Sequence, residues 1–159
     1  MVFRHHSRVG SESRFSHRLR VRFAETDAQG IVFNGNYLTY CDVAWTEYFR
    51  ALGLTYADMI SRGMDMVLVG AVQEFKSPAV FDEMLEISAR VLAIGTSSIN
   101  FEFEVYGADD GRFVHRARST YVTVDPVTKS KIPVPDVLRQ VISTHEGLVF
   151  SSSKNSETS

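Results

Sequence analysis

The chain has 159 residues, 44% of them hydrophobic and 23% charged, and carries a formal net charge of −2 at pH 7. This length and composition fit one globular domain with its own core, and the weak net charge gives no global attraction for nucleic acid or a membrane surface. Because Cys41 is the single cysteine and no apolar run approaches the ~20 residues of a membrane span, we expect a cytoplasmic protein without disulfides.

Both ends of the chain are polar. Residues 1–17 are rich in arginine, histidine and serine and lack the apolar stretch of a secretory signal, and serines crowd the last residues. We therefore predict disordered tails over residues 1–17 and 147–159, on either side of one folded domain over residues 18–146. An organelle transit peptide is the alternative interpretation of the arginine-rich N-terminal segment.

The domain begins with residues 19–23, where apolar and charged residues alternate as in a half-buried strand. After a glycine-containing loop, apolar residues recur at i, i+3, i+4 and i+7 from about Tyr37 to Leu52. This spacing predicts a helix, with Asn36 as its N-terminal cap and Gly53 at its end. The helix is apolar around nearly its whole circumference, so we expect it to be largely buried.

Four more strands are predicted after the helix, from their β-branched and alternating apolar residues. They cover residues 66–75, 84–94, 97–106 and 112–124. A turn over residues 107–111 joins the last two, and a short final helix begins at Pro135. This order predicts the α+β class, with an antiparallel sheet packed on one helix. Since one helix cannot cover both faces of the sheet, we expect apolar side chains that point away from it to require a homo-oligomer.

The loop before the long helix gives the clearest indication of function. It contains Asp27, close to the helix N-terminus, where a carboxylate stays ionised and free backbone N–H groups can hold a developing negative charge. A base or nucleophile beside such oxyanion donors is what hydrolysis of an acyl ester or thioester requires. The structural alternative for Asp27 is an Asx turn or a helix cap.

Neighbours of Asp27 are candidates for contacts with substrate or with the oxyanion. They are Gln29, Gly30, Val32, Asn34, Gly35 and Tyr37. The two glycines permit a tight turn or close approach of a substrate, and amides near residues 32–36 are the candidate oxyanion donors. Asn34 and Tyr37 can hydrogen-bond substrate or water, or can serve only for capping and packing.

Residues 26–37, Thr-Asp-Ala-Gln-Gly-Ile-Val-Phe-Asn-Gly-Asn-Tyr, resemble the signature of acyl-CoA thioesterases related to 4-hydroxybenzoyl-CoA thioesterase. Residues 45–50, Gly53-Leu54 and residues 77–82 support the resemblance, which covers roughly residues 18 to 139. It implies the hotdog fold, a sheet curled around one central helix, and homodimers or homotetramers with active sites at subunit interfaces. The catalytic carboxylate of the family maps onto Asp27, whereas some relatives carry histidine where Asn34 stands.

The resemblance implies hydrolysis of acyl-CoA to a free acid and CoA, with Asp27 as nucleophile or general base and no metal or redox cofactor. We expect the acyl group between helix and sheet near Tyr37, Tyr40 and Trp45, whose rings fit an aromatic or a short-to-medium aliphatic chain. The candidates for holding the CoA phosphates, or alternatively for a solvated strand face, are Arg112, Arg116, Arg118, Lys129 and Lys131.

The sequence also allows other functions and other candidate catalytic residues. A non-catalytic acyl-CoA-binding module is the main alternative, and a hydratase or dehydratase would need an acid–base pair that the sequence does not indicate. Glu47 on the helix is the second carboxylate to consider, because another branch of hotdog thioesterases uses a helix glutamate. Cys41 lies mid-helix on the apolar stripe, which favours a buried small residue, and no histidine pair has the spacing of metal ligands.

Overall fold

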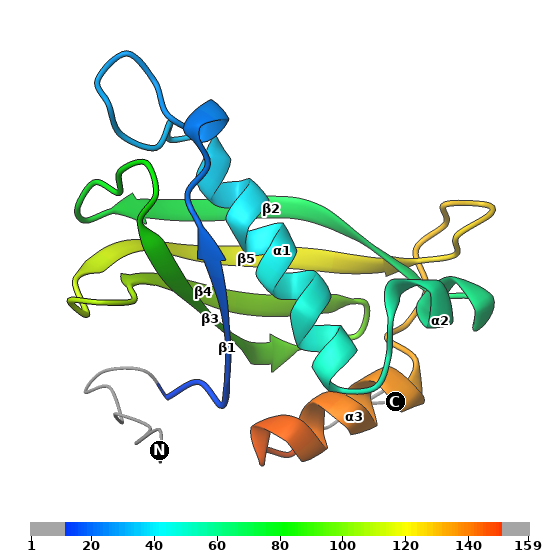
Figure 1. The fold of residues 1–159 in the computed structure, drawn as a ribbon. Coiled ribbons are helices and arrows are strands. Elements are labelled where there is room, and N and C mark those ends of the chain that lie inside the picture. The colour runs from blue at the N-terminus through cyan, green and yellow to red at the C-terminus, as the bar shows by residue number, and fades with distance from the viewer. Residues whose placement is uncertain (1–11, 151–159) are drawn as a thin grey trace, which may run out of the picture.

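A computed structural model describes residues 12–150 (Figure 1). One antiparallel sheet has the order β1-β3-β4-β5-β2. Its strands are β1 (Phe15–Arg20), β2 (Asp65–Phe75), β3 (Met84–Ile94), β4 (Ser98–Gly107) and β5 (Phe113–Val124). The helices are η1 (Phe23–Glu25), α1 (Asn36–Ala51), α2 (Tyr56–Ser61) and α3 (Asp136–Glu146). The predicted α+β class, with one long helix on an antiparallel sheet, is confirmed, and within residues 12–150 no helix combines the length and apolarity of a membrane span.

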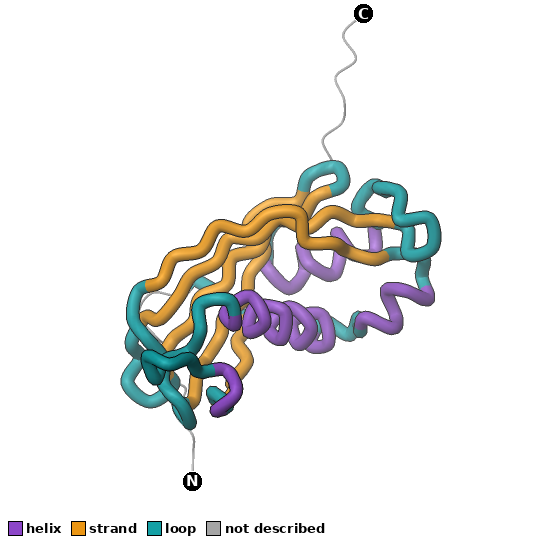
Figure 2. The backbone as a smooth tube through the Cα atoms, turned by 90° about the horizontal axis from the view of Figure 1, so that it is seen from above, coloured by secondary structure: helices purple, strands orange, loops and turns teal. Residues whose placement is uncertain are grey.

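The core lies between α1 and the concave face of the curved sheet (Figure 2). The inward positions of β4, Phe101 and Phe103 among them, are fully buried, and the Phe101 ring meets Tyr48 of α1 edge-on with 5.3 Å between ring centroids. Cys41 is also buried, and burial raises the pKa of its thiol to about 12. It therefore acts as the small buried residue that its position on the helix predicts.

Several boundaries of helices and strands in the structure differ from those that we predicted. Strand β1 begins at Phe15, so residues 15–17 belong to the sheet and not to the predicted tail, whereas residues 1–11 and 151–159 lie outside the described residues. The N-cap of α1 is Gly35, without a side-chain cap, and Asn36 is the first helical residue. The prediction of Asn36 as the cap is wrong because its amide Nδ2 donates instead to the Glu25 carbonyl, at 2.8 Å.

The outer face of the sheet differs from our prediction that apolar side chains there require a partner. Its central position holds Glu102, only 3% exposed, which accepts hydrogen bonds from Arg90 and Arg118 on the two neighbouring strands. Charged side chains on this face thus form hydrogen bonds with one another across neighbouring strands. Most of the exposed large apolar side chains of the sheet lie instead on the edge strand β2, at Val67, Leu68, Val69, Val72 and Phe75.

Candidate active site

Asp27 belongs to the segment between η1 and α1, which forms a loop that folds back on itself at the N-terminal end of α1 (Figure 1). Its backbone N–H donates to the Ile31 carbonyl at 3.0 Å, and Gly30, at φ +75°, returns a bond to the Asp27 carbonyl at 2.9 Å. The positive φ explains the glycine at this turn. The Asp27 carboxylate, half-buried, accepts the Gln29 N–H at 2.8 Å. This Asx turn fixes the carboxylate and leaves it further acceptor capacity toward a substrate or a water.

The backbone amides between this loop and α1 divide into occupied and open donors. Val32 donates to the Ala79 carbonyl and Phe33 to the Glu25 carbonyl, each at 2.9 Å, so Val32 has no free N–H for an oxyanion. In contrast, the N–H groups of Asn34 and Gly35 donate to no acceptor within residues 12–150, and both residues are exposed. The open amides at the positive end of the α1 dipole are therefore those of Asn34 and Gly35.

Glu25, at the start of the loop, is hydrogen-bonded to the end of the loop and to α1. We did not predict this role from the sequence. The Glu25 side chain is 8% exposed and accepts the Tyr40 hydroxyl at 2.6 Å, the Arg22 backbone N–H at 2.9 Å and the Arg22 guanidinium at 2.6 Å. Burial alone would raise the pKa of Glu25, but the hydrogen bonds from Tyr40 and Arg22 outweigh it and hold the pKa below its usual value. Glu25 is thus a buried, ionised and fully paired carboxylate.

The space beneath the first turn of α1 is filled with side chains. Tyr37 and Tyr40 are 3% and 1% exposed, and the Tyr37 ring stacks on His115 with 4.6 Å between centroids. Trp45 stacks on Tyr121 of β5. The acyl site expected between helix and sheet near Tyr37, Tyr40 and Trp45 stays a prediction, and in this structure these rings pack into the core.

His115 is a buried residue at this end of the molecule for which the sequence gives no local signal. Its Nε2 lies 3.0 Å from the Gln73 Oε1 of β2, and its Nδ1 has no partner within the described residues. Burial lowers the pKa of His115 to about 4, so the ring is neutral at pH 7. It supports the Tyr37 ring as a neutral aromatic surface.

Exposed aromatic rings surround the Asp27 loop on the solvent side. Phe23 and Phe81 meet edge-on with centroids 5.8 Å apart and are 76% and 55% exposed, and Phe33 is 51% exposed. The Ile31–Val80 bridge joins the loop to the segment that carries Phe81. Exposed apolar surface therefore lies on the loop that carries Asp27 and on the segment bridged to it, outside the core.

The basic residues that the sequence suggested as a cluster do not come together. Arg112 precedes β5, and its guanidinium donates hydrogen bonds to Asp110, Glu83 and the Pro78 carbonyl. Lys129 follows the same strand, and its ammonium pairs with Asp65 at 3.5 Å. Twelve strand residues at about 3.3 Å each separate these ends by roughly 40 Å, so the five residues cannot form one phosphate site within one copy of the chain.

The remaining members of that group and the second carboxylate also have local partners. Arg116 pairs with Glu74 at 3.4 Å and Arg118 with Glu102 at 3.0 Å, on the outer face of the sheet. Glu47, about three turns along α1, pairs with Arg50 at 3.3 Å. Lys131 is exposed in the segment after β5.

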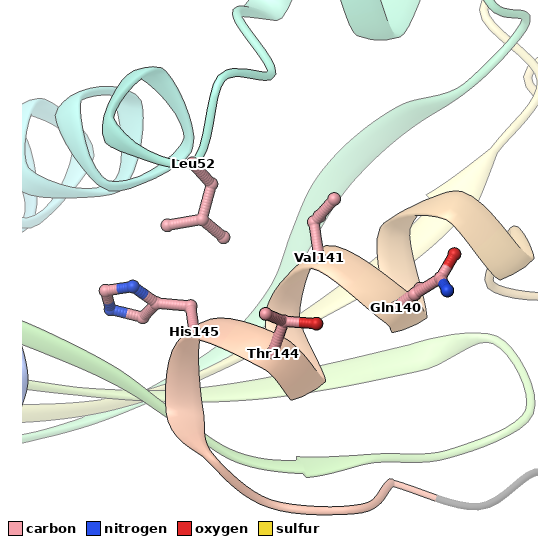
Figure 3. Close-up of a pocket in the computed structure, with 5 residues that line it drawn as sticks. All are labelled: Leu52, Gln140, Val141, Thr144 and His145. Atoms are coloured by element: carbon pink, nitrogen blue, oxygen red, sulfur yellow. The ribbon is translucent and has the colours of Figure 1, made fainter.

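A pocket of about 450 Å³ lies at the opposite end of α1 from Asp27. It is lined by Leu52, Gln140, Val141, Thr144 and His145, at the junction of α1 with α3 (Figure 3). The C-terminal end of a helix presents carbonyl oxygens, which disfavour an anion. This pocket is therefore poorly suited to the chemistry of a developing oxyanion.

Comparison with known proteins defines the family. The thioesterase-like superfamily matches residues 21–142. The chain is 29% identical over 132 residues to the 1,4-dihydroxy-2-naphthoyl-CoA hydrolase of Nostoc punctiforme, covering 82% of this chain and 88% of the relative. It is 26% identical over 117 residues to the acyl-CoA thioester hydrolase YbgC of Escherichia coli, covering 74% and 87%.

The fold is also that of a solved relative. A crystal structure of a hypothetical protein from Aquifex aeolicus superposes with a TM-score of 0.74 at 30% identity, over 80% of this chain and 98% of that chain. The chain belongs to the thioesterase-like superfamily, and the resemblance of residues 26–37 to hotdog-fold thioesterases is confirmed.

Proposed function

We propose that this protein hydrolyses acyl-CoA thioesters to a free acid and CoA, with Asp27 as its catalytic carboxylate. The observation that carries the proposal is a hydrogen-bonded loop that fixes the Asp27 carboxylate and ends in the open Asn34 and Gly35 amides at the start of α1. Membership of the thioesterase-like superfamily and two relatives named as hydrolases of CoA thioesters support the substrate class.

The proposed reaction can follow two routes from Asp27. As general base, the carboxylate takes a proton from a water whose oxygen attacks the thioester carbonyl carbon; as nucleophile, it attacks that carbon itself and forms a mixed anhydride that water then hydrolyses. In both routes the Asn34 and Gly35 amides stabilise the oxyanion, the carbon–sulfur bond breaks, and CoA leaves as a thiolate that takes up a proton. We propose no metal or redox cofactor, since water is the only co-substrate required.

The proposal assigns structural roles to Gln29, Gly30 and Tyr37. Gln29 fixes the Asp27 carboxylate through its backbone N–H, and Gly30 closes the turn. Tyr37 is buried against His115 and so packs the first turn of α1. The acyl group is proposed to contact the exposed Phe23, Phe33 and Phe81 rings.

The experiment is a screen of aliphatic, hydroxylated and aromatic acyl-CoAs for release of free CoA. The proposal expects saturable hydrolysis of at least one class, and the Asp27→Asn variant should still bind a non-hydrolysable CoA thioether of that class. Binding without turnover across the whole panel would instead indicate the non-catalytic acyl-CoA module. Hydration of an enoyl-CoA without thioester cleavage would indicate a hydratase.

We also propose that two copies associate through β2, as a homodimer or as the unit of a homotetramer, in the cytoplasm. Strand β2 pairs with β5 along one edge, and no strand within residues 12–150 pairs with its other edge. Val69 and Val72 on it are 58% and 71% exposed, which is a liability for an edge strand left open to solvent. A Val69→Glu/Val72→Glu variant should sediment as a monomer, and a monomeric wild-type protein would contradict the assembly.

A further inference from the structure

The structure ties both ends of the Asp27 loop to one residue. The Glu25 carbonyl accepts the Phe33 N–H at 2.9 Å and the Asn36 amide at 2.8 Å, so the chain entering the loop is bonded to the chain leaving it. Its carboxylate accepts the Tyr40 hydroxyl at 2.6 Å, from the second turn of α1. Asp27, two residues beyond Glu25, and the open Asn34 and Gly35 amides thus belong to one loop whose two ends are bonded to each other and to the start of α1.

The hydroxyl of Tyr40 has this one carboxylate as its partner among the described contacts, deep in the core. Both groups would be unfavourable if left unpaired: the carboxylate because a buried charge without donors is destabilising, and the hydroxyl because it is removed from water. The Glu25–Tyr40 bond therefore favours one position of the loop over any in which Glu25 moves away from α1. Catalysis by a carboxylate and oxyanion donors depends on such positions, and a displacement of about 1 Å can lower the rate ~100-fold.

We infer that Glu25, Tyr40 and Asn36 are positioning residues for the hydrolysis, setting Asp27 against the Asn34 and Gly35 amides without contacting the substrate. The inference rests on the proposed function, because it assigns these residues to the Asp27 site. It predicts that weakening the bonds at Glu25 lowers kcat more than it changes KM, since binding of the acyl-CoA is not what these bonds fix.

The other end of α1 offers a matched control. The Tyr48 hydroxyl donates to the Glu146 carboxylate, also at 2.6 Å, and Tyr48 is as fully buried as Tyr40. Each carboxylate also accepts a backbone N–H, from Arg22 at 2.9 Å and from Val91 at 3.0 Å. Tyr40→Phe and Tyr48→Phe thus remove the same bond from the same helix, and only the first lies beside Asp27.

The test compares kcat, KM and melting temperature for Tyr40→Phe and Tyr48→Phe on the best acyl-CoA of the screen. We expect similar losses of melting temperature, but a kcat loss of at least ~10-fold for Tyr40→Phe alone, with KM within about threefold of wild type. Equal kcat values for the two variants would overturn the inference. If Tyr40→Phe does not fold, Asn36→Ala decides the matter, because it removes one bond to Glu25 without leaving a buried charge unpaired; unchanged kcat in Asn36→Ala would then overturn it.

Asp27→Asn, measured in the same assay, separates this inference from the proposed function. If Asp27→Asn is inactive while Tyr40→Phe behaves like Tyr48→Phe, Asp27 keeps its role and the positioning role fails. If Asp27→Asn keeps the wild-type kcat, the proposed site itself fails.

Discussion

The two ends of α1 use the same local chemistry for different purposes. At each end a buried tyrosine hydroxyl donates at 2.6 Å to a carboxylate, Tyr40 to Glu25 and Tyr48 to Glu146. At the C-terminal end this bond holds α3 on α1, and the C-cap Leu52 N–H is bonded to the preceding turn. At the N-terminal end the bond holds a loop that carries Asp27 and ends in two amides, of Asn34 and Gly35, with no acceptor in the described part of the chain.

The helix direction explains why only one of these ends suits hydrolysis of a thioester. Open N–H groups and the positive end of the dipole stabilise an oxyanion at the start of a helix, whereas carbonyl oxygens at its end oppose one. The pocket beside Leu52 is therefore on the unsuitable side even though it has a volume of about 450 Å³. The size of a cavity is a weaker guide to this site than the polarity of the helix next to it.

The largest expected effect that tests this comparison is at Gly35. Its φ of −65° is the value that proline adopts, so Gly35→Pro removes one open N–H without changing φ at this residue. Proline also disfavours a helical conformation at the preceding Asn34, so the melting temperature of the variant is measured beside kcat to show that the turn is kept. We expect kcat to fall ~100-fold or more, as for the loss of one oxyanion donor elsewhere. Gly35→Ala keeps the N–H, and its Cβ would meet only the exposed Phe33 ring, at 3.0 Å; its loss should stay below about tenfold. Equal losses in both variants would mean that the amide has no part in the reaction.

A smaller effect is expected on stability, at His115 under the first turn of α1. Its pKa is about 4 in the folded protein and 6.5 in the unfolded chain. Between these values the unfolded chain binds a proton that the folded protein does not, so the free energy of unfolding falls as the pH is lowered from 6.5 toward 4.

His115→Phe removes this proton uptake while retaining a ring beneath Tyr37. The loss of unfolding free energy between pH 7 and pH 5, measured by urea denaturation, should be smaller in His115→Phe than in wild type by about 2 kcal/mol. The same pH dependence in both proteins would show that the His115 ring is protonated as readily in the folded state as in the unfolded chain.

The smallest expected effect is at Thr55, which caps α2 beyond the C-terminal end of α1. Its Oγ1 accepts the Asp58 N–H at 3.2 Å, and Asp58 returns a bond to the Thr55 N–H at 2.9 Å. Thr55→Ala should lower the melting temperature by about 2–4 °C and leave kcat unchanged. A kcat loss comparable to that of Gly35→Pro would contradict the assignment of catalysis to one end of the helix.

Much of the fold was predictable because its signals are local. The alternation in residues 84–94 gives β3 its observed bounds, and Gly53, at φ +78°, follows the end of α1 as predicted. Helix α2 was missed although Thr55 and Asp58 form a capping box, since six residues are too few for a helical period.

The parts of the site that the sequence could not give depend on contacts between distant residues. Val32 was predicted as a candidate oxyanion donor, but its N–H donates a hydrogen bond to the carbonyl of Ala79, which lies 47 positions later in the chain. The amide of Asn36 reaches back to Glu25 and does not cap α1. Asp27 could be proposed from the sequence because the loop, the helix start and the family resemblance all fall within residues 26–37; its catalytic role stays a prediction.

The most direct test of the central claim is kcat for acyl-CoA hydrolysis by Asp27→Asn beside Glu47→Gln, the second carboxylate that the sequence offered as a candidate. Asp27 belongs to the loop that ends in the open amides, whereas Glu47 lies about three turns along α1 and pairs with Arg50. We expect Asp27→Asn to lose ~100-fold or more in kcat with its fold intact, and Glu47→Gln to retain most of its activity. The opposite result, with Asp27→Asn active and Glu47→Gln inactive, would contradict the account.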